Sequence, residues 1–139
     1  MFYNYKKATS VKQKKEEYNS FSSLFELYEI LLKVFDIDTC APRLRNQYRK
    51  ENPSLGHCSI VSFLVQDIFG GEVYGVPLLS GGYHCFNYIE GVIFDLTSEQ
   101  FIDEKLNYTL DYKQNRETHF KDNEKYNRYL LLKQRLKKY

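Results

Sequence analysis

The chain has 139 residues, the length of one ordinary domain, and its 42% of hydrophobic residues is enough to build a packed core. Its 20 Lys and Arg residues nearly balance its 18 Asp and Glu residues, and this net charge of +2 argues against nucleic acid or a membrane surface as a partner. The first residues lack the apolar segment of a secretory signal, and no stretch approaches the roughly 18 apolar residues of a transmembrane helix. We therefore expect a cytoplasmic protein, and its three cysteines, an odd number, argue against a disulfide framework.

The first part of the chain predicts an irregular segment followed by a strong helix. Residues 1–19 are rich in Lys and Glu and weakly patterned, which indicates an N-terminal arm or ragged helix before a single domain over 20–139. Apolar residues then recur at helical spacing over 21–35, which predicts an amphipathic helix. Ser20 and Ser23 are both suitable N-caps, and Ser23 has a glutamate three residues later, as in a capping box.

The middle of the chain predicts a buried helix and three strands. A polar, basic connection and a turn lead to the mostly apolar run 58–69, which two glycines end as a helical C-cap. Residues 72–76 then have the composition of a strand. Residues 83–89 and 92–96 predict a β-hairpin, since Glu-Gly separates two runs rich in β-branched and aromatic residues.

The last part of the chain is predicted to be mainly helical. A helix-start signal predicts a short helix over 98–105, the polar segment 107–117 is predicted to be a loop, and 118–139 has high helical propensity. The residues expected to face inward from this last helix are Tyr126, Tyr129, Leu130 and Leu136. The whole order favours an α+β fold, with helices packed on a small antiparallel sheet.

Three residues have the types needed for nucleophilic catalysis: Cys58, His84 and Asp95. A thiol nucleophile needs its thiolate populated near neutral pH, and Cys58 begins a predicted helix, whose N-terminus lowers a cysteine pKa. A histidine must reach the sulfur as general base and later protonate the leaving group. A carboxylate must hold the imidazole in the correct tautomer, and His84 and Asp95 lie on the two arms of one predicted hairpin.

The length of the hairpin turn decides whether this pair can meet. If Glu90 and Gly91 form a two-residue turn, His84 and Asp95 share one face of the sheet and lie diagonally opposite each other. A three-residue turn would place them on opposite faces. With the shorter turn, Cys85 and Asn87 point to the other face, away from the site, where a structural hydrogen bond is the expected role of Asn87.

Each candidate also has an ordinary structural interpretation. A cysteine at the start of an apolar helix is commonly a small buried hydrophobic residue. A histidine in a strand is commonly structural, and Asp95 could cap the helix that follows it. On residue types alone, both interpretations of Cys58, His84 and Asp95 stay open.

A metal site is the second type of chemistry to consider, because His57-Cys58 and His84-Cys85 form two Cys/His pairs. Zinc needs four ligands that converge tetrahedrally. Neighbouring strand residues point to opposite faces, so His84 and Cys85 are poorly placed to bind one ion. The spacing therefore disfavours a metal, and no cofactor is expected.

An interaction module without catalysis is the alternative function. The basic and aromatic flank, together with the Lys/Arg-rich tail, offers a surface for a protein partner; the residues of the flank are Arg43, Arg45, Tyr48, Arg49 and Lys50. Acidic residues among them weaken this case, because such charge runs commonly form solvated faces. Thiol reactivity distinguishes the two functions, since only an enzyme needs a fast, pH-shifted Cys58, with Cys40 as the internal comparison.

A run of separated motifs over residues 52–101 resembles the YunG-like family of small bacterial proteins. The motifs are NPSLGHC (52–58), SIVSFLVQDIFGGEVY (59–74) and GGYHCFNYIEGVIFDLTSEQF (81–101). They match the family's N-P-x-x-G-x-C turn, a helix that ends V-Q-D-x-F-G-G, an H-x-x-N strand and a D-L-T-x-x-Q-F close. The flanking helices match only loosely.

The His84 to Thr97 portion also resembles the histidine–aspartate hairpin of transglutaminase-like and papain-like cysteine enzymes, with Phe86 as the usual aromatic after the histidine. This resemblance implies a helix carrying Cys58 packed against an antiparallel sheet carrying His84 and Asp95. It also implies thiolate attack on an amide or ester carbonyl to form an acyl-enzyme, which water or an amine releases. The implied substrate is a peptide, an isopeptide, a protein or a small amide or ester.

The oxyanion site is the point where the chain departs from that superfamily. Its members commonly carry Gln just before the cysteine, and this chain has His57. The backbone N–H of Cys58 is the expected oxyanion donor, with His57 or Asn52 as further side-chain candidates and Asn87 as a more remote positioning residue.

Overall fold

A computed structural model describes residues 1–13, 21, 23–102 and 104–139 of the chain. Its helices and strands, with 3₁₀ helices labelled η, are α1 (Tyr5–Ala8), α2 (Leu24–Val34), η1 (Pro42–Gln47), α3 (Cys58–Phe69), β1 (Glu72–Pro77), β2 (Tyr83–Ile89), β3 (Val92–Phe94), η2 (Ser98–Gln100), β4 (Lys113–Gln114), α4 (Arg116–Phe120) and α5 (Asn123–Leu136). The chain is an α+β fold with helices on a small antiparallel sheet, as the sequence predicted.

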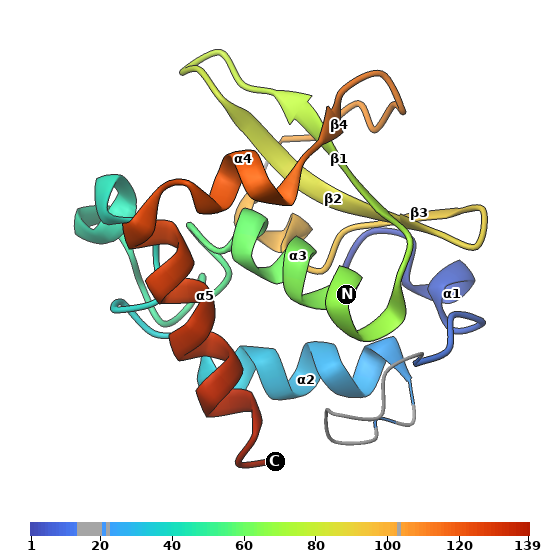
Figure 1. Cartoon of the computed structure of the whole chain (residues 1–139), viewed down its shortest axis with the longest axis horizontal. Coiled ribbons are helices and arrows are strands. Elements are labelled where there is room, and N and C mark those ends of the chain that lie inside the picture. The colour runs from blue at the N-terminus through green and yellow to red at the C-terminus, as the bar shows by residue number, and fades with distance from the viewer. Residues whose placement is uncertain (14–20, 22, 103) are drawn as a thin grey trace.

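Helix α3 is the centre of the molecule. It lies between the sheet on one side and α2 on the other, with α5 along its flank (Figure 1). Most of its side chains are buried, which explains why the sequence of this helix is apolar nearly all round. The predicted helix 58–69 and its glycine C-cap are therefore confirmed.

The sheet has the order β3-β2-β1-β4, and all its strand pairs are antiparallel. Glu90 and Gly91 both have a positive φ, 53° and 79°, as the two central residues of a primed hairpin turn require. Ile89 pairs with Val92 across this turn. The two-residue turn is therefore confirmed, and the register that places His84 and Asp95 on one face follows from it.

Helix α2 begins where the capping signal at Ser23 indicated. The Ser23 side chain accepts a hydrogen bond from the backbone N–H of Glu26, and the helix starts at Leu24. The alternative cap, Ser20, lies outside the described residues. The apolar stripe of α2 packs into the main core beneath α3.

The described part of the N-terminal segment belongs to this same core. Phe2, Ala8 and Val11 are buried in it, and Tyr3 forms a β-bridge with Asp95. Of the two interpretations of this segment, a ragged helix fits residues 1–13 better than an arm, since they contain α1 and contribute to the core, while 14–19 lie outside the described residues.

Two predictions for the second half of the chain were wrong, and a third is confirmed. The helix predicted over 98–105 is only the short η2, and the predicted loop 107–117 contains β4 and the start of α4. The predicted helical tail from 118 is confirmed, and it is divided into two helices because the Asp122 side chain accepts the backbone N–H groups of Glu124 and Lys125 and starts α5 there. The strand β4 depends on pairing with β1, a long-range contact that local pattern does not reveal.

The inward face of α5 also differs in part from the prediction. Tyr129 and Leu136 are buried, but Tyr126 and Leu130 are 39% and 41% exposed. Leu132 completes the buried face, and Leu130 lies about 100° around the helix from Tyr129.

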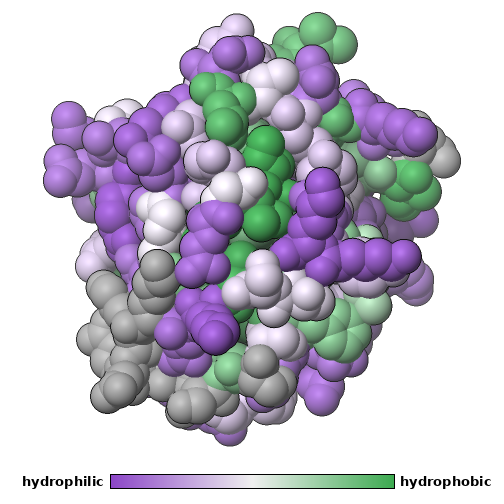
Figure 2. Space-filling model, turned by 90° about the vertical axis from the view of Figure 1, so that its right-hand side faces the viewer, coloured by the Kyte–Doolittle hydropathy of each residue, from purple (hydrophilic) through white to green (hydrophobic). Residues whose placement is uncertain are grey.

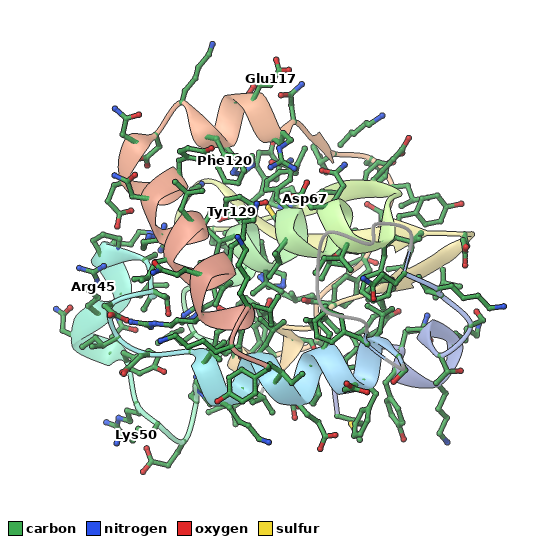
Figure 3. The ribbon with its side chains drawn as sticks, turned by 60° about the horizontal axis from the view of Figure 1, so that its bottom comes forward. Arg45, Lys50, Asp67, Glu117, Phe120 and Tyr129 are labelled. Atoms are coloured by element: carbon green, nitrogen blue, oxygen red, sulfur yellow. The ribbon has the colours of Figure 1, made fainter. Side chains whose placement is uncertain are left out.

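A polar contact joins α3 to the C-terminal helices. Asp67 on α3 accepts hydrogen bonds from Tyr129 on α5 and from the guanidinium of Arg116 on α4 (Figure 3). Asp67 is mostly buried, and a buried carboxylate is costly unless it is paired. The guanidinium of Arg116 compensates its charge. The contact fixes the C-terminal helices against the helix that carries Cys58.

Two surface features bear on function. Among the described residues, no helix is both long and apolar enough to cross a membrane. On the side that carries the β2–β3 turn and α1, apolar residues form a narrow strip flanked by hydrophilic ones (Figure 2). The concave site described below lies on the opposite side.

Candidate active site

A cleft of about 750 Å³ is lined by residues of η1, of the start of α5 and of the loop between β1 and β2. Cys58 and His84 both line it. Its other walls combine apolar and charged side chains: Leu44, Leu55, Leu78, Leu79, Tyr83 and Phe101, with Arg43, Glu104, Asp122, Glu124, Lys125 and Arg128. This is a concave site with a few polar groups near one nucleophile, the usual character of a ligand site.

A tight turn places Cys58 on the wall of the cleft. Gly56 has a φ of +78°, and a Cβ atom there would lie 2.5 Å from the Cys40 sulfur and 2.9 Å from the Ala41 nitrogen. Its carbonyl accepts the Ala41 N–H at 3.0 Å. Only glycine suits this close approach. The turn leaves Cys58 partly exposed as the first residue of α3.

His84 and Asp95 form a buried pair beside this cysteine. The Nε2 atom of His84 lies 2.6 Å from Oδ2 of Asp95, and each side chain is 1% exposed. Because Nε2 is engaged with the carboxylate, Nδ1 is the nitrogen left for the Cys58 sulfur. The edge of the Phe101 ring packs on the imidazole, with ring centres 4.7 Å apart.

Asp95 is held by several donors besides His84. Its Oδ1 accepts the backbone N–H of Thr97 at 3.1 Å and the Thr97 hydroxyl at 3.2 Å, and its Oδ2 accepts the Tyr108 hydroxyl at 2.7 Å. Its own N–H donates to the carbonyl of Tyr3 at 3.3 Å. Asp95 therefore organises the turn into η2 with one oxygen and orients the imidazole with the other.

The surroundings of Cys58 favour its thiolate. A side-chain hydrogen bond from Cys85 lowers the pKa of Cys58 most, and the charge of His84 and a hydrogen bond with it lower it further, against the opposing effect of burial. Burial lowers the pKa of His84, but Asp95 and Cys58 outweigh it and raise that pKa to about 10. Both directions favour a thiolate–imidazolium pair at neutral pH.

The position of Cys85 corrects a prediction. The hairpin pattern indicated that Cys85 points away from the site, but Cys85 is the largest of the causes that lower the pKa of Cys58. Cys85 does face α3, as strand alternation requires, and it is buried beside Phe63 of that helix. Since Cys58 is the first residue of α3, where this helix meets β2, its sulfur reaches both Cys85 and His84.

His57 has a structural place rather than the expected place at the oxyanion. Its ring is fully buried against Phe35, Nδ1 donates to the Leu55 carbonyl at 2.9 Å, and Nε2 lies 2.7 Å from the Thr39 hydroxyl, from which it accepts. Burial lowers the pKa of His57 to about 4, so the ring is neutral. With both nitrogens engaged outside the cleft, it offers no donor to a substrate.

The two asparagines also lie outside the cleft lining. Asn52 donates to the backbone carbonyl of Gln100 at 3.4 Å, and Asn87 donates to the backbone carbonyl of Ser62 at 2.9 Å. Asn87 therefore ties β2 to α3, the structural role expected for it. Asn52 ties the turn before α3 to η2.

Three further residues belong to the site although the sequence did not mark them as site residues: Tyr108, Phe101 and Gln100. Gln100 lines the cleft, and its Oε1 accepts the Gly56 N–H at 3.4 Å while its amide donates to the Thr97 carbonyl at 3.1 Å. The Q-F of the D-L-T-x-x-Q-F motif was the available signal for Gln100 and Phe101. Tyr108 sits in an irregular segment that had no such pattern.

The sequence raised two other types of site, a metal site and a basic surface for a protein partner. In the part of the chain that the structure describes, no group of three or more His, Cys, Asp or Glu is arranged to hold a metal ion. Several of the basic side chains are paired with acidic ones: Arg45 and Arg128 contact Glu124, and Arg135 contacts Asp38.

Comparison with known proteins identifies a matching family and one curated relative. The model of a family described as "YunG protein" matches residues 23–139. One curated relative, "Uncharacterized protein YunG" of Bacillus subtilis (strain 168), is 38% identical over 56 residues, which cover 40% of this chain and 48% of the relative. The match thus spans about half the length of that relative. No solved structure matches the chain.

Proposed function

This chain belongs to the YunG family, and we propose that it is a cysteine-dependent acyl hydrolase or transferase. In this proposal Cys58 is the nucleophile, His84 is the general base and then the general acid, and Asp95 orients and charges the imidazole. The substrate is an amide, a peptide, an isopeptide or an ester.

One observation carries the proposal: a partly exposed thiol at the start of a helix lies in a cleft beside a buried His–Asp pair. Each component has its own structural explanation, but their convergence at one sulfur is what nucleophilic catalysis requires. A purely structural cysteine needs neither a lowered pKa nor access to a cleft.

The first chemical step is attack of the Cys58 thiolate on a carbonyl carbon held in the cleft. The first N–H groups of an α-helix have no carbonyl partner within the helix, and Cys58 and Ser59 both line the cleft at the start of α3. These N–H groups stabilise the oxyanion of the tetrahedral intermediate, a role that the buried His57 cannot fill.

Protonated His84 then gives its proton to the leaving amine or alcohol, and an acyl-enzyme forms on Cys58. Neutral His84 next removes a proton from water or from an acceptor amine, which attacks the thioester and releases the product. The Asp95 carboxylate holds Nε2 throughout, so that Nδ1 faces the sulfur and the substrate.

We also propose that the core is papain-like or transglutaminase-like. The support is the arrangement itself: a helix that begins with the cysteine, packed on an antiparallel sheet whose hairpin carries the histidine and the aspartate. The arrangement matches what the sequence resemblance implied for these three residues.

The walls of the cleft suggest what part of a substrate fits there. Leu78, Leu79 and Tyr83 offer apolar surface, while Arg43 and Glu104 offer charges of both signs. A peptide or protein segment with mixed apolar and polar groups suits such walls better than a uniformly charged ligand.

The direct test is acylation of the thiol by a reactive ester, p-nitrophenyl acetate, followed by mass spectrometry of the peptides. We expect an acetyl group on Cys58 that water or hydroxylamine removes, while Cys40, fully buried in the same molecule, stays unmodified. Cys58→Ala should abolish turnover with the fold intact, His84→Ala should nearly abolish it, and Asp95→Asn should cost less.

Full turnover by Cys58→Ala, or acetylation that favours Cys40, would contradict the mechanism. An ordinary, slow Cys58 would instead favour the alternative of an interaction module built on the same fold, and a search for protein partners would then replace the substrate screen.

A further inference from the structure

Lys125 on α5 lines the same cleft as Cys58 and His84. It is partly buried, and its ammonium donates a hydrogen bond to Nδ1 of His119 at 2.9 Å. We propose that Lys125 is a subsite for a carboxylate group, so that the cleft selects amides or esters that carry one. This inference rests on the proposed acyl chemistry and specifies the class of its substrate.

A chain of hydrogen bonds holds this lysine in place. An ammonium has no lone pair, so Nδ1 of His119 is the acceptor and the ring is neutral. Its Nε2–H donates to Oε1 of Gln114 at 2.8 Å, and the Gln114 amide donates to the Tyr112 carbonyl at 3.1 Å. Burial and the charge of Lys125 lower the pKa of His119 to about 4, in agreement with a neutral ring. The ammonium is therefore oriented before a ligand binds.

This arrangement leaves the charge of Lys125 uncompensated. Two nearby arginines contact a carboxylate, since Arg45 and Arg128 both pair with Glu124. Among the described residues, no acidic side chain forms an ion pair with Lys125, whose partner is the neutral His119. An ammonium has three N–H donors, and His119 accepts from one. The others suit a carboxylate, because hydrogen bonds between charged groups are about twice as strong as neutral ones.

Three other charged side chains that line the cleft are all exposed: Arg43, Glu104 and Asp122. One oxygen of Asp122 accepts two backbone N–H groups at the start of α5. Arg43 and Glu104 have opposite charges, and solvent weakens the effect of both on a ligand. The partly buried Lys125 is therefore the cation of this lining that is best placed to select an anionic group.

A substrate that uses both parts of the cleft has a carboxylate at Lys125 and an amide or ester carbonyl at Cys58. The apolar side chains of Leu78 and Leu79 in the same lining suit the segment between the two groups. Lys125 contacts the carboxylate in the bound substrate and in the transition state alike. Its removal should therefore weaken binding and leave the limiting rate of acylation unchanged.

The test measures binding to Cys58→Ala, which cannot be acylated. Two pairs of stable amides are titrated, each with a carboxylate and a neutral member: the mono-4-nitroanilide of glutaric acid with the 4-nitroanilide of valeric acid, and 4-acetamidobenzoate with 4-acetamidobenzamide. The first pair carries the carboxylate on the acyl group and the second on the leaving group. NMR signals of the His119 ring report occupancy beside Lys125. We expect the carboxylate of at least one pair to bind about tenfold more tightly than its neutral analogue.

Lys125→Gln in the Cys58→Ala background is the informative variant. Lys121→Gln and Arg43→Gln remove the same charge elsewhere: Lys121 is exposed and absent from the cleft lining, and Arg43 is an exposed part of it. The advantage of the carboxylate should disappear in Lys125→Gln and persist in both controls. Lys125→Arg keeps the charge and should keep most of the advantage. If a variant fails to fold, the comparison of probes in Cys58→Ala still decides.

Equal affinity for the two members of both pairs would overturn the inference, and so would an advantage that survives in Lys125→Gln. These readouts are dissociation constants and need no acyl transfer. A failure of the proposed function is seen separately, as a wild-type Cys58 that p-nitrophenyl acetate leaves unmodified.

Discussion

His84 and Asp95 are in contact through Nε2 and Oδ2, 2.6 Å apart, at a depth where each side chain is only 1% exposed. A pair at this depth is little screened by solvent, so the Asp95 carboxylate acts strongly on the charge of the His84 imidazole. The pair lies on the arms of a hairpin closed by Glu90 and Gly91, which makes its geometry a property of the sheet rather than of a loop.

Asp95→Asn should lower the pKa of His84, because the carboxylate is the main group that keeps the buried imidazole protonated. NMR titration of the His84 ring measures this directly. The substitution should also destabilise the fold by about 1–3 kcal/mol in urea unfolding, because the buried donors of Thr97 and Tyr108 lose a charged acceptor. A His84 titration identical to wild type would contradict this assignment of the carboxylate.

Asn87→Ala should destabilise the protein without changing the thiol. The Asn87 amide donates to the Ser62 carbonyl at 2.9 Å, and its loss removes this buried hydrogen bond between β2 and α3 at a cost of about 0.5–1.5 kcal/mol. Urea unfolding and the pH profile of Cys58 alkylation are both measured. A stability unchanged from wild type would contradict the packing role of Asn87, and a profile shifted as far as in Asp95→Asn would show that Asn87 acts on the site.

His57 should make the protein sensitive to mild acid. Its folded pKa of about 4 lies below the ordinary 6.5, so its contribution to stability is present above pH 6.5 and is lost as pH falls toward 4. Between pH 7 and pH 5 this loss amounts to about 2 kcal/mol of unfolding free energy.

The matched variant for this prediction is His57→Gln, whose amide keeps a donor and an acceptor but does not titrate. Its unfolding free energy should fall less than that of wild type over the same pH interval, and His119 contributes equally to both proteins. Equal slopes for the two proteins would show that the charge of His57 does not matter to folding.

Local pattern was enough to predict the elements that carry the site. The apolar run of α3 and its glycines have a helical signature of their own, and the Glu-Gly turn sets the strand register through its backbone conformation. For this reason the amino-acid sequence predicts that His84 and Asp95 share one face of the sheet if the turn has two residues, and the structure confirms that turn.

Contacts that depend on how the helix crosses the sheet could not be deduced in this way. Strand alternation correctly places Cys85 on the face toward α3. It does not show where along β2 the helix begins, and this position determines whether Cys85 affects the pKa of Cys58. Tyr108 and Tyr3 meet Asp95 across long separations in the sequence. His57 looked like an oxyanion donor because its place beside Cys58 is visible in sequence, whereas the pocket that buries its ring is not.

The central claim is that Cys58 is an activated thiolate paired with His84, and the pH dependence of its alkylation by iodoacetamide tests this most directly. Mass spectrometry reads Cys58 and Cys40 in one sample, in wild type and in His84→Ala. We predict a Cys58 midpoint well below the ordinary value of about 8.5, a return toward that value in His84→Ala, and slow alkylation of buried Cys40 in both. A Cys58 profile at the ordinary value that His84→Ala leaves unchanged would contradict the account.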